Sequence, residues 1–358
     1  MENMVKGHLE YLKNRKVFVT GHTGFKGSWL IAMLRQLNCE VYGYALECTS
    51  DPNHFSLLKS NGHYVYADIR DPNKLKQAVS ESGAEIVFHL AAQSLVRPSY
   101  RDPRYTYEVN VMGSLNLLEA VRASPSVRAV VMVTTDKVYA NREEHYAYRE
   151  DDKLGGHDMY SSSKACCEIL IDSYRLSFLK PDLVTENQQI LLASLRAGNV
   201  IGGGDWSEDR LIPDLVRAAA TKQTAKIRNP QAVRPWQHVL DCLNAYLIVG
   251  AELLKGNREA AGSWNVAPEK AAVYAVENIL TLSTQYWNEI KYTILPQQNA
   301  PHEANLLMLD NTKIKSKLNW TPVYSTQETV ALTIEWYRKY YESGDCITER
   351  QVEKFLAA

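Results

Sequence analysis

Short apolar runs alternate with longer segments of helical period through the first half of this 358-residue chain. The runs of strand length cover residues 16–20, 40–45, 86–91, 129–134 and 191–197, and the helical segments cover 28–37, 72–80, 110–122 and 161–179. Strands that are apolar on both faces are typical of a parallel sheet with helices on both sides. The alternation therefore predicts an α/β fold with a Rossmann-type doubly wound parallel sheet.

The pattern changes after residue 197, where loops rich in Gly, Pro and Trp separate shorter elements. A chain of 358 residues suggests about two domains, yet no Pro/Gly/Ser-rich linker divides it. We therefore expect interleaved domains. A dinucleotide-type Rossmann domain would comprise residues 1–195 plus about 237–262, and a smaller mixed α/β C-terminal substrate domain about 196–236 plus 263–358.

Charge and hydropathy exclude several classes of partner. Lys and Arg number 40 against 41 Asp and Glu, a net charge of −1, so no nucleic acid or anionic membrane is expected as a partner. The longest apolar stretch, 245–254, is too short to span a bilayer, and the N-terminus has no apolar signal segment, which favours a cytoplasmic protein. The six cysteines show no CxxC spacing, so neither disulfides nor a metal site is expected.

Three glycines follow the first predicted strand and open the first predicted helix: Gly21, Gly24 and Gly27. Glycines at such a turn let backbone amides approach a pyrophosphate and let the helix pack closely on the sheet. The phosphates would lie at the helix N-terminus. Because a strand precedes the loop and a helix follows it, we interpret the segment as a dinucleotide site rather than an ordinary glycine-rich turn.

The GxxGxxG spacing resembles that of the extended short-chain dehydrogenase/reductase superfamily. The segments 66–71 (YADIRD) and 88–93 (FHLAAQ) resemble the same superfamily, and Asp68 would there meet the adenine amine. Taken alone, Asp68 is better explained as a helix cap or turn residue. The resemblance implies NAD as cofactor, with these residues as its ligands: Gly21, Thr23, Gly24, Phe25, Lys26, Gly27, Asp68, Ile69, Leu90, Ala91, Ala92, Asn110, Tyr160 and Lys164.

The end of the second predicted strand departs from that pattern. NAD enzymes of this kind usually carry an Asp there for the ribose 2′-hydroxyl, but the chain has Gly43 to Leu46, and Glu47 comes one or two residues late. No Arg stands at this strand end to hold the 2′-phosphate of NADP. NAD is therefore favoured over NADP, with Glu47 as a candidate ribose ligand.

Tyr160 and Lys164 are spaced four residues apart on a predicted helix and so share one face. A neighbouring ammonium favours the phenolate of a tyrosine, so Tyr160 is predicted to act as a general base. YxxxK also arises by chance as a surface pair, but here it follows the strand that ends at Thr134. In the resemblance, Lys164 also holds the nicotinamide ribose.

Thr135, Asp136 and Lys137 follow that strand, at the edge where doubly wound folds place ligands. Thr135 takes the place of the superfamily's catalytic Ser/Thr. The pair after it resembles the acid and base of the nucleoside-diphosphate-sugar 4,6-dehydratases, and Lys in place of Glu resembles the CDP-glucose branch. The alternative is a surface ion pair. The resemblance implies that Lys137, as a free amine, removes the C5 proton while protonated Asp136 protonates the departing 6-hydroxyl.

Two later segments, 194–206 and 227–241, match the same group. The implied substrate ligands are Ser94, Arg97, Asn199, Arg210, Arg234 and His302. A planar guanidinium such as that of Arg234 suits a diphosphate, although packing and surface charge explain it equally well. His238 and Asp241 are more simply structural.

The resemblance implies a hydro-lyase that oxidises C4 of CDP-glucose, removes water across C5 and C6, and reduces C6 to give CDP-4-dehydro-6-deoxyglucose. It also implies a role in deoxysugar and lipopolysaccharide O-antigen biosynthesis. The helices expected at 107–122 and 161–179 build a four-helix interface in relatives, so a homodimer or homotetramer is expected. Alternatives are another nucleotide-hexose dehydratase, a sugar-nucleotide 4-epimerase, and a non-catalytic dinucleotide-sensing regulator.

Overall fold

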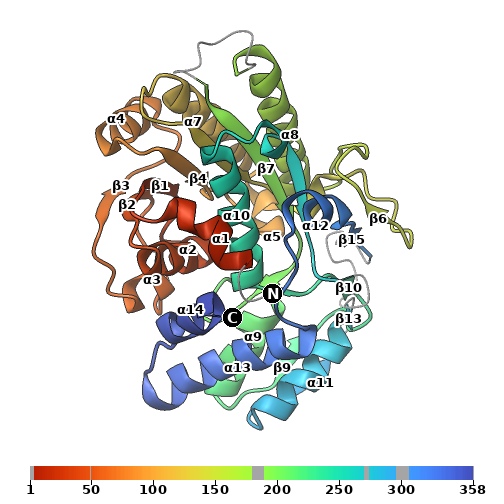
Figure 1. Ribbon diagram of the computed structural model, residues 1–358. Coiled ribbons are helices and arrows are strands. Elements are labelled where there is room, and N and C mark those ends of the chain that lie inside the picture. Colours follow the sequence, from red (N-terminus) through yellow and green to blue (C-terminus); the bar gives the residue numbers. More distant parts are fainter. Residues whose placement is uncertain (1–3, 49, 180–188, 270–273, 296–305, 358) are drawn as a thin grey trace.

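A seven-stranded parallel sheet forms the centre of the computed structural model, which describes residues 4–48, 50–179, 189–269, 274–295 and 306–357 (Figure 1). In the order β12-β7-β5-β4-β1-β2-β3, every neighbouring pair is parallel. The strands are β1 (Lys16–Thr20), β2 (Glu40–Ala45), β3 (His63–Tyr66), β4 (Ile86–His89), β5 (Ala129–Val133), β7 (Leu191–Ala197) and β12 (Ser263–Val266). The predicted doubly wound α/β fold is confirmed.

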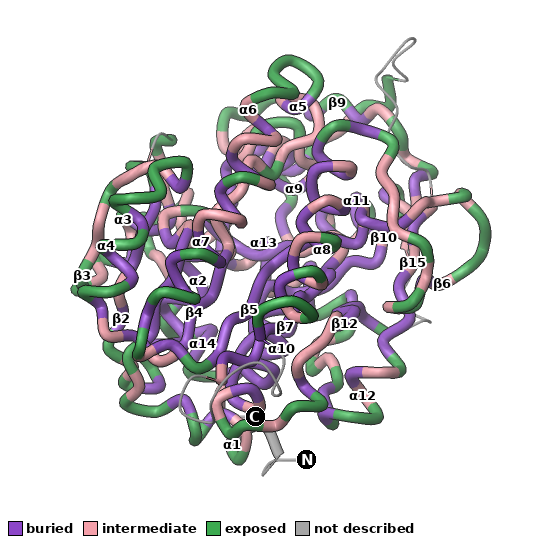
Figure 2. Tube along the Cα trace, turned by 90° about the horizontal axis from the view of Figure 1, so that it is seen from above, coloured by how far each residue is buried: buried purple, intermediate pink, exposed green. Residues whose placement is uncertain are grey.

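Helices cover both faces of the sheet because its strands are apolar on both sides. In β1, Val17 and Val19 belong to one buried cluster and Phe18 to the other. The first cluster includes α2 (Phe25–Gln36) and α10 (Val239–Leu254), and the second includes side chains of these helices: α4 (Pro72–Ser82), α7 (Gly113–Arg122) and α8 (Met159–Ser177). Figure 2 shows the buried trace of β5, β7 and α10 running through the middle of the molecule.

Local sequence signals place several helix ends. The Asp158 carboxylate accepts the Ser161 amide at 2.9 Å and so caps α8. The helix expected over 110–122 is shorter than predicted, because a π-helical turn at 108–112 precedes α7. Such turns are frequent at functional sites, and this one carries the buried Asn110.

In the described part of the chain, short strands, most of them from the second half, pair in four small sheets outside the main sheet. The paired short strands are β6 (Ala147–Tyr148) with β15 (Met308–Leu309), β8 (Val200–Ile201) with β11 (Gln237–His238), β9 (Ala225–Ile227) with β14 (Tyr292–Ile294), and β10 (Val233–Arg234) with β13 (Tyr274–Ala275). The remaining helices are α1 (Met4–Leu9), α3 (His54–Leu57), α5 (Val96–Arg101), α6 (Pro103–Tyr107), α9 (Leu211–Ala220), α11 (Val276–Tyr286), α12 (Thr312–Leu318), α13 (Thr326–Ser343) and α14 (Thr348–Ala357).

Segments far apart in sequence lie together. β12 begins directly after the boundary expected at 262 and pairs with β7 in the main sheet, and α14 packs against α2. Helices α9, α11 and α13 lie on the side of the molecule away from α4, α7 and α8 (Figure 1). The division into two domains stays a prediction. Among the described helices, none is long and apolar enough to cross a bilayer.

Candidate functional site

The glycine loop joins β1 to α2 beside the point where the strand order reverses, between β1 and β4. Gly21 has φ +75, and a Cβ there would stand 2.7 Å from the Ala91 nitrogen. A Cβ on Gly27 would overlap the Gly21 carbonyl. These two glycines therefore allow the loop to pack against the end of β4 and against the first turn of α2.

The N-terminus of α2 is open to a ligand. Gly24 is its N-cap and no side chain caps the helix, so the first amides lack side-chain partners. A Cβ on Gly24 would meet only the Gly21 oxygen, at 3.4 Å. Uncapped amides and the positive end of the helix dipole favour an anion here, and the residues present fit a dinucleotide pyrophosphate.

One cavity of about 1690 Å³ runs from this loop across the carboxyl edge of the sheet. It is larger than the roughly 300–1,000 Å³ that one drug-sized ligand usually requires, so two ligands can share it. Every predicted site residue lines this cavity, apart from Asn110 and His302. His302 lies outside the described residues.

Asn110 lies beside the cavity instead of in its wall. Its side-chain oxygen accepts the Gln93 amide at 2.9 Å, and its Nδ2 donates to the Gln93 carbonyl and to the Ser163 hydroxyl. Asn110 thus ties the loop after β4 to α8. A direct contact between Asn110 and the cofactor stays a prediction.

At the end of the cavity near β2 and β3, the Asp68 carboxylate binds the Arg70 side chain at 2.7 Å and the Arg70 amide at 2.9 Å. The hydrogen bonds from Arg70 lower the pKa of Asp68, so Asp68 is an acceptor. Glu47 lies two residues beyond β2 and lines the same cavity. An acidic pair at this end fits the hydroxyls and amine of an adenosine.

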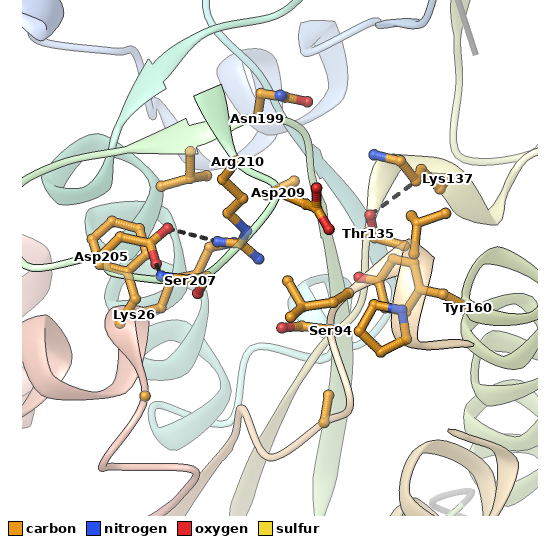
Figure 3. A pocket seen from close by; sticks show the side chains of 18 of the residues that line it. Lys26, Ser94, Thr135, Lys137, Tyr160, Asn199, Asp205, Ser207, Asp209 and Arg210 are labelled. Carbon is orange, nitrogen blue, oxygen red and sulfur yellow. Dashed lines mark hydrogen bonds and ion pairs between the residues drawn. The ribbon is translucent and has the colours of Figure 1, made fainter. Parts of the chain in front are cut away.

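The turn after β5 presents Thr135, Asp136 and Lys137 to the cavity. Figure 3 shows Thr135 and Lys137 there. The Thr135 hydroxyl donates to Asp136 Oδ1 at 2.9 Å, and Lys137 Nζ is 3.9 Å from the same oxygen. Asp136 Oδ2 is buried and has no hydrogen-bond partner among the described residues. Oδ2 is therefore the atom available to carry a proton to a ligand.

Tyr160 and Lys164 begin α8 and are both buried. Burial is the largest effect on Tyr160 and raises its pKa to about 12. A hydrogen bond with Thr135 and the charge of Arg210 act in the opposite direction and lower the pKa. Lys164 donates from Nζ to the Val133 carbonyl at 3.1 Å, and burial lowers its pKa. The charge of Arg210 thus adds to what favours the Tyr160 phenolate, and the role of Lys164 stays a prediction.

Arginines line the opposite wall of the cavity. Arg210 binds Asp205 at 2.8 Å, and Figure 3 shows this pair across the cavity from Tyr160 and Lys137. Asp209 binds Arg228 at 3.0 Å and Arg97 at 3.4 Å. Guanidinium groups of this kind suit a diphosphate. Ser94, Asn199 and Arg234 complete the predicted substrate set along the cavity.

Sequence reasoning missed several of these side chains. Asp205, Asp209 and Arg228 line the cavity but carried no assigned role. Glu168 and Arg196 form a fully buried ion pair of 2.8 Å directly beneath the site. The signal for Glu168 was present, because it follows Tyr160 and Lys164 at the same spacing of four and so shares their helix face.

Comparisons with known proteins show which family the chain belongs to. Residues 18–333 match the family model described as GDP-mannose 4,6 dehydratase. The chain is 41% identical to the CDP-glucose 4,6-dehydratase of Salmonella typhimurium over 97% of this chain and 98% of that protein. It is 27% identical to a dTDP-glucose 4,6-dehydratase of Xanthomonas campestris over 89% and 92% of the two chains.

Solved structures show the same fold. The UDP-glucose 4-epimerase of Thermus thermophilus, a complex with NAD, superposes with a TM-score of 0.77 at 24% identity, covering 90% of this chain and 98% of that one. The epimerase Mth375 of Methanothermobacter thermautotrophicus gives a TM-score of 0.81 at 20% identity, covering 98% of both chains. The chain belongs to the nucleotide-sugar 4,6-dehydratase family of the extended short-chain dehydrogenase/reductases.

Proposed function

We propose that the protein is an NAD-dependent hydro-lyase that converts CDP-glucose to CDP-4-dehydro-6-deoxyglucose. The observation that carries the proposal is the turn Thr135–Lys137, which supplies an acid and an amine to the same cavity as Tyr160 and Lys164. The 41% identity to the CDP-glucose enzyme of Salmonella supports the choice of CDP-glucose. The glycine cradle and the NAD complex among the structural neighbours support NAD.

When bound, NAD supplies the two-electron acceptor and donor that this redox-neutral conversion requires at C4 and C6. The chain's own residues handle the protons. Tyr160, as phenolate, accepts the proton of the sugar 4-hydroxyl, and Thr135 hydrogen-bonds the same sugar oxygen. The resulting 4-ketone acidifies the C5–H bond.

Elimination then needs a base at C5 and an acid at the 6-hydroxyl. Lys137, as the free amine, takes the C5 proton. Asp136, through Oδ2, gives its proton to the 6-hydroxyl, which leaves as water. The 4-keto-6-deoxy sugar is complete once Lys137 returns the proton to C5 and C6 receives the hydride taken from C4, which bound NAD would supply. Tyr160 then releases its proton to solvent and Asp136 takes one up, so the only atoms lost are those of water.

A 4-epimerase is the rival function within this fold, and it does not need Asp136 and Lys137. The test is incubation of the protein with CDP-, dTDP-, UDP- and GDP-glucose, followed by the alkaline ultraviolet absorbance of the 4-ketosugar. We expect a ketosugar from CDP-glucose. If epimerised sugar alone is formed, the epimerase is the correct assignment, and binding of NAD without turnover would identify a regulator.

Two variants locate the elimination step. In Asp136→Asn and Lys137→Ala, we expect reduced cofactor to accumulate on addition of CDP-glucose while ketosugar formation falls by about 10²–10⁴-fold. Asp172→Asn is the control, because Asp172 lies on the exposed side of α8, where its side chain is 46% exposed. Native rates in either active-site variant would place the acid or base elsewhere.

We also propose that the protein is a homodimer, or a dimer of such dimers, through α7 and α8. Ile169 and Leu176, seven residues apart on α8, are 59% and 60% exposed, and Met112 directly before α7 is 49% exposed. Apolar side chains of this size in a row mark an interaction surface. The variant Ile169→Glu/Leu176→Glu should halve the mass measured by light scattering, and an unchanged mass would contradict the proposed surface.

The proposal places the enzyme in the cytoplasm and in the synthesis of CDP-linked deoxysugars for O-antigen. The proposed product, a CDP-linked 4-keto-6-deoxy sugar, is the basis for this pathway. Deletion of the gene should remove the deoxysugar from the surface polysaccharide, and cell fractionation should recover the protein with cytoplasmic enzymes. An unaltered polysaccharide would contradict the pathway.

A further inference from the structure

Glu168 lies at the centre of a buried polar network beneath the candidate site. Its Oε1 accepts the Thr134 hydroxyl at 2.5 Å, and its Oε2 accepts the Ser194 hydroxyl and the Arg196 guanidinium, both at 2.8 Å. Glu168 and Arg196 are 0% and 2% exposed at their side chains. The network therefore joins α8 to the end of β5 and to β7.

Stability alone is a poor explanation for such a pair. Removing two charges from water costs about as much as their attraction returns, so apolar residues would fill the same space equally well. Burial alone would raise the pKa of Glu168, but the Arg196 charge and the two hydroxyls lower it, so Glu168 is charged. A charge retained in the core is best explained by the geometry that it fixes.

That geometry is the position of the catalytic turn. Lys164 donates to the Val133 carbonyl at 3.1 Å, and Glu168, one helix turn later, binds Thr134. Two successive turns of α8 thus hold the two residues directly before Thr135. At the other end, Arg196 donates to the Tyr139 hydroxyl at 2.8 Å. The turn is anchored on both sides by one ion pair.

We propose, on the basis of the proposed dehydratase function, that Glu168 is a positioning residue that aligns the acid and base of the turn, Asp136 and Lys137, with the helix that carries Tyr160. The side chain of Asp136 is held by the hydroxyl of Thr135, which belongs to the same turn. The positions of Asp136 and Lys137 therefore depend on how the turn itself is held. Loosening the network should therefore impair elimination more than the first oxidation, which depends on Tyr160 in α8 itself.

The test compares two variants, each of which removes one hydroxyl that donates a hydrogen bond to Glu168. Thr134→Val removes the link to the turn, and Ser194→Ala removes the link to β7 and is the matched control. We expect ketosugar formation to fall on the order of 10–100-fold in Thr134→Val, as for a misplacement of about 1 Å, with reduced cofactor accumulating. Ser194→Ala should stay close to wild type. Equal losses in both variants, or wild-type turnover in Thr134→Val, would overturn the proposal.

A second readout does not depend on turnover. Amide hydrogen exchange over residues 135–139 should be faster in Thr134→Val than in Ser194→Ala, and Glu168→Gln should show the same increase if it folds. Unchanged exchange over 135–139 in Thr134→Val would refute the positioning role. Absence of ketosugar from the wild-type protein would refute the dehydratase function instead, so the two failures are distinguishable.

Discussion

Gly198 leaves open the side of Asp136 that faces away from Thr135. A Cβ at position 198 would stand 3.1 Å from Asp136 Oδ2 and 2.7 Å from Pro235 Cγ. The oxygen that we assign as the proton donor to the 6-hydroxyl is buried, and it keeps its position because residue 198 has no side chain. The residue that follows β7 therefore limits the space around the turn that follows β5.

Gly198→Ala should consequently impair elimination. The new methyl group would displace Asp136 or Pro235, because interiors at this density leave no room for it. We expect ketosugar formation to fall about tenfold or more while reduced cofactor still forms, since displacement of about 1 Å has effects of this size. Gly262→Ala is the matched control, because its Cβ would meet only Lys313 Nζ at 3.7 Å. Equal rates in the two variants would contradict the role of Gly198.

Tyr160→Phe should lower turnover by about 10²–10⁴-fold, the usual contribution of a general base. Because burial raises the pKa of Tyr160 to about 12, the phenolate fraction and the rate of the first oxidation should rise with pH throughout the neutral and alkaline range. The residual rate of Tyr160→Phe should lack this rise. Tyr174→Phe on the same helix is the control, since its hydroxyl binds Glu119 away from the cavity. Normal turnover of Tyr160→Phe would remove Tyr160 from the mechanism.

Alanine substitutions at two glycines of the first loop should have different effects on stability and on dinucleotide binding. In Gly21→Ala the Cβ would lie 2.7 Å from the Ala91 backbone at a φ of +75, so we expect a loss of stability as well as of binding. In Gly24→Ala the Cβ has ordinary contact, and the melting temperature should be nearly unchanged while NAD binding weakens. Calorimetric titration and thermal melts check both. A stable Gly21→Ala variant that binds NAD normally would refute the role of the glycine loop in dinucleotide binding.

Stability should fall as the pH drops below about 6.5. Burial lowers the pKa of His54, His89 and His238 from 6.5 to about 3, and that of His22 to about 4. The unfolded chain therefore binds protons below pH 6.5 that the folded chain does not, and each histidine contributes up to about 1.4 kcal/mol per pH unit. Asp241 acts in the opposite direction, because burial raises its pKa from 3.8 to about 7.

Burial also raises the pKa of Glu150 and Asp214, but from ordinary values of 4.5 and 3.8. The four histidines should outweigh the three carboxyls, so the free energy of unfolding measured in urea should be lower at pH 5 than at pH 7. His54→Gln should reduce this difference, since it removes one of the groups while keeping a partner for Ser28 and Thr348. Equal stability at the two pH values would contradict the assignment of these histidines as neutral.

Local patterns in the sequence predicted the parts of the site that lie close together along the chain. The strand, loop and helix around Gly21 were predicted from residues 16–37, and their structure confirms the predicted elements. The turn Thr135–Lys137 and the pair Tyr160 and Lys164 each follow from spacing within one element. Expectations for residues 296–305, including His302, concern residues that the structure does not describe.

The sequence by itself determined the order of strands and helices. A strand or helix that is buried on one or both faces has its apolar residues at regular intervals, and these intervals can be recognised along the chain. Only the tertiary structure decided which distant charges meet. Arg97 in α5 and Asp209 just before α9 are far apart in sequence and bind at 3.4 Å. Glu168 and Arg196 come from a helix and a strand. Such contacts depend on how closely packed elements fit in three dimensions, and no local period records that fit.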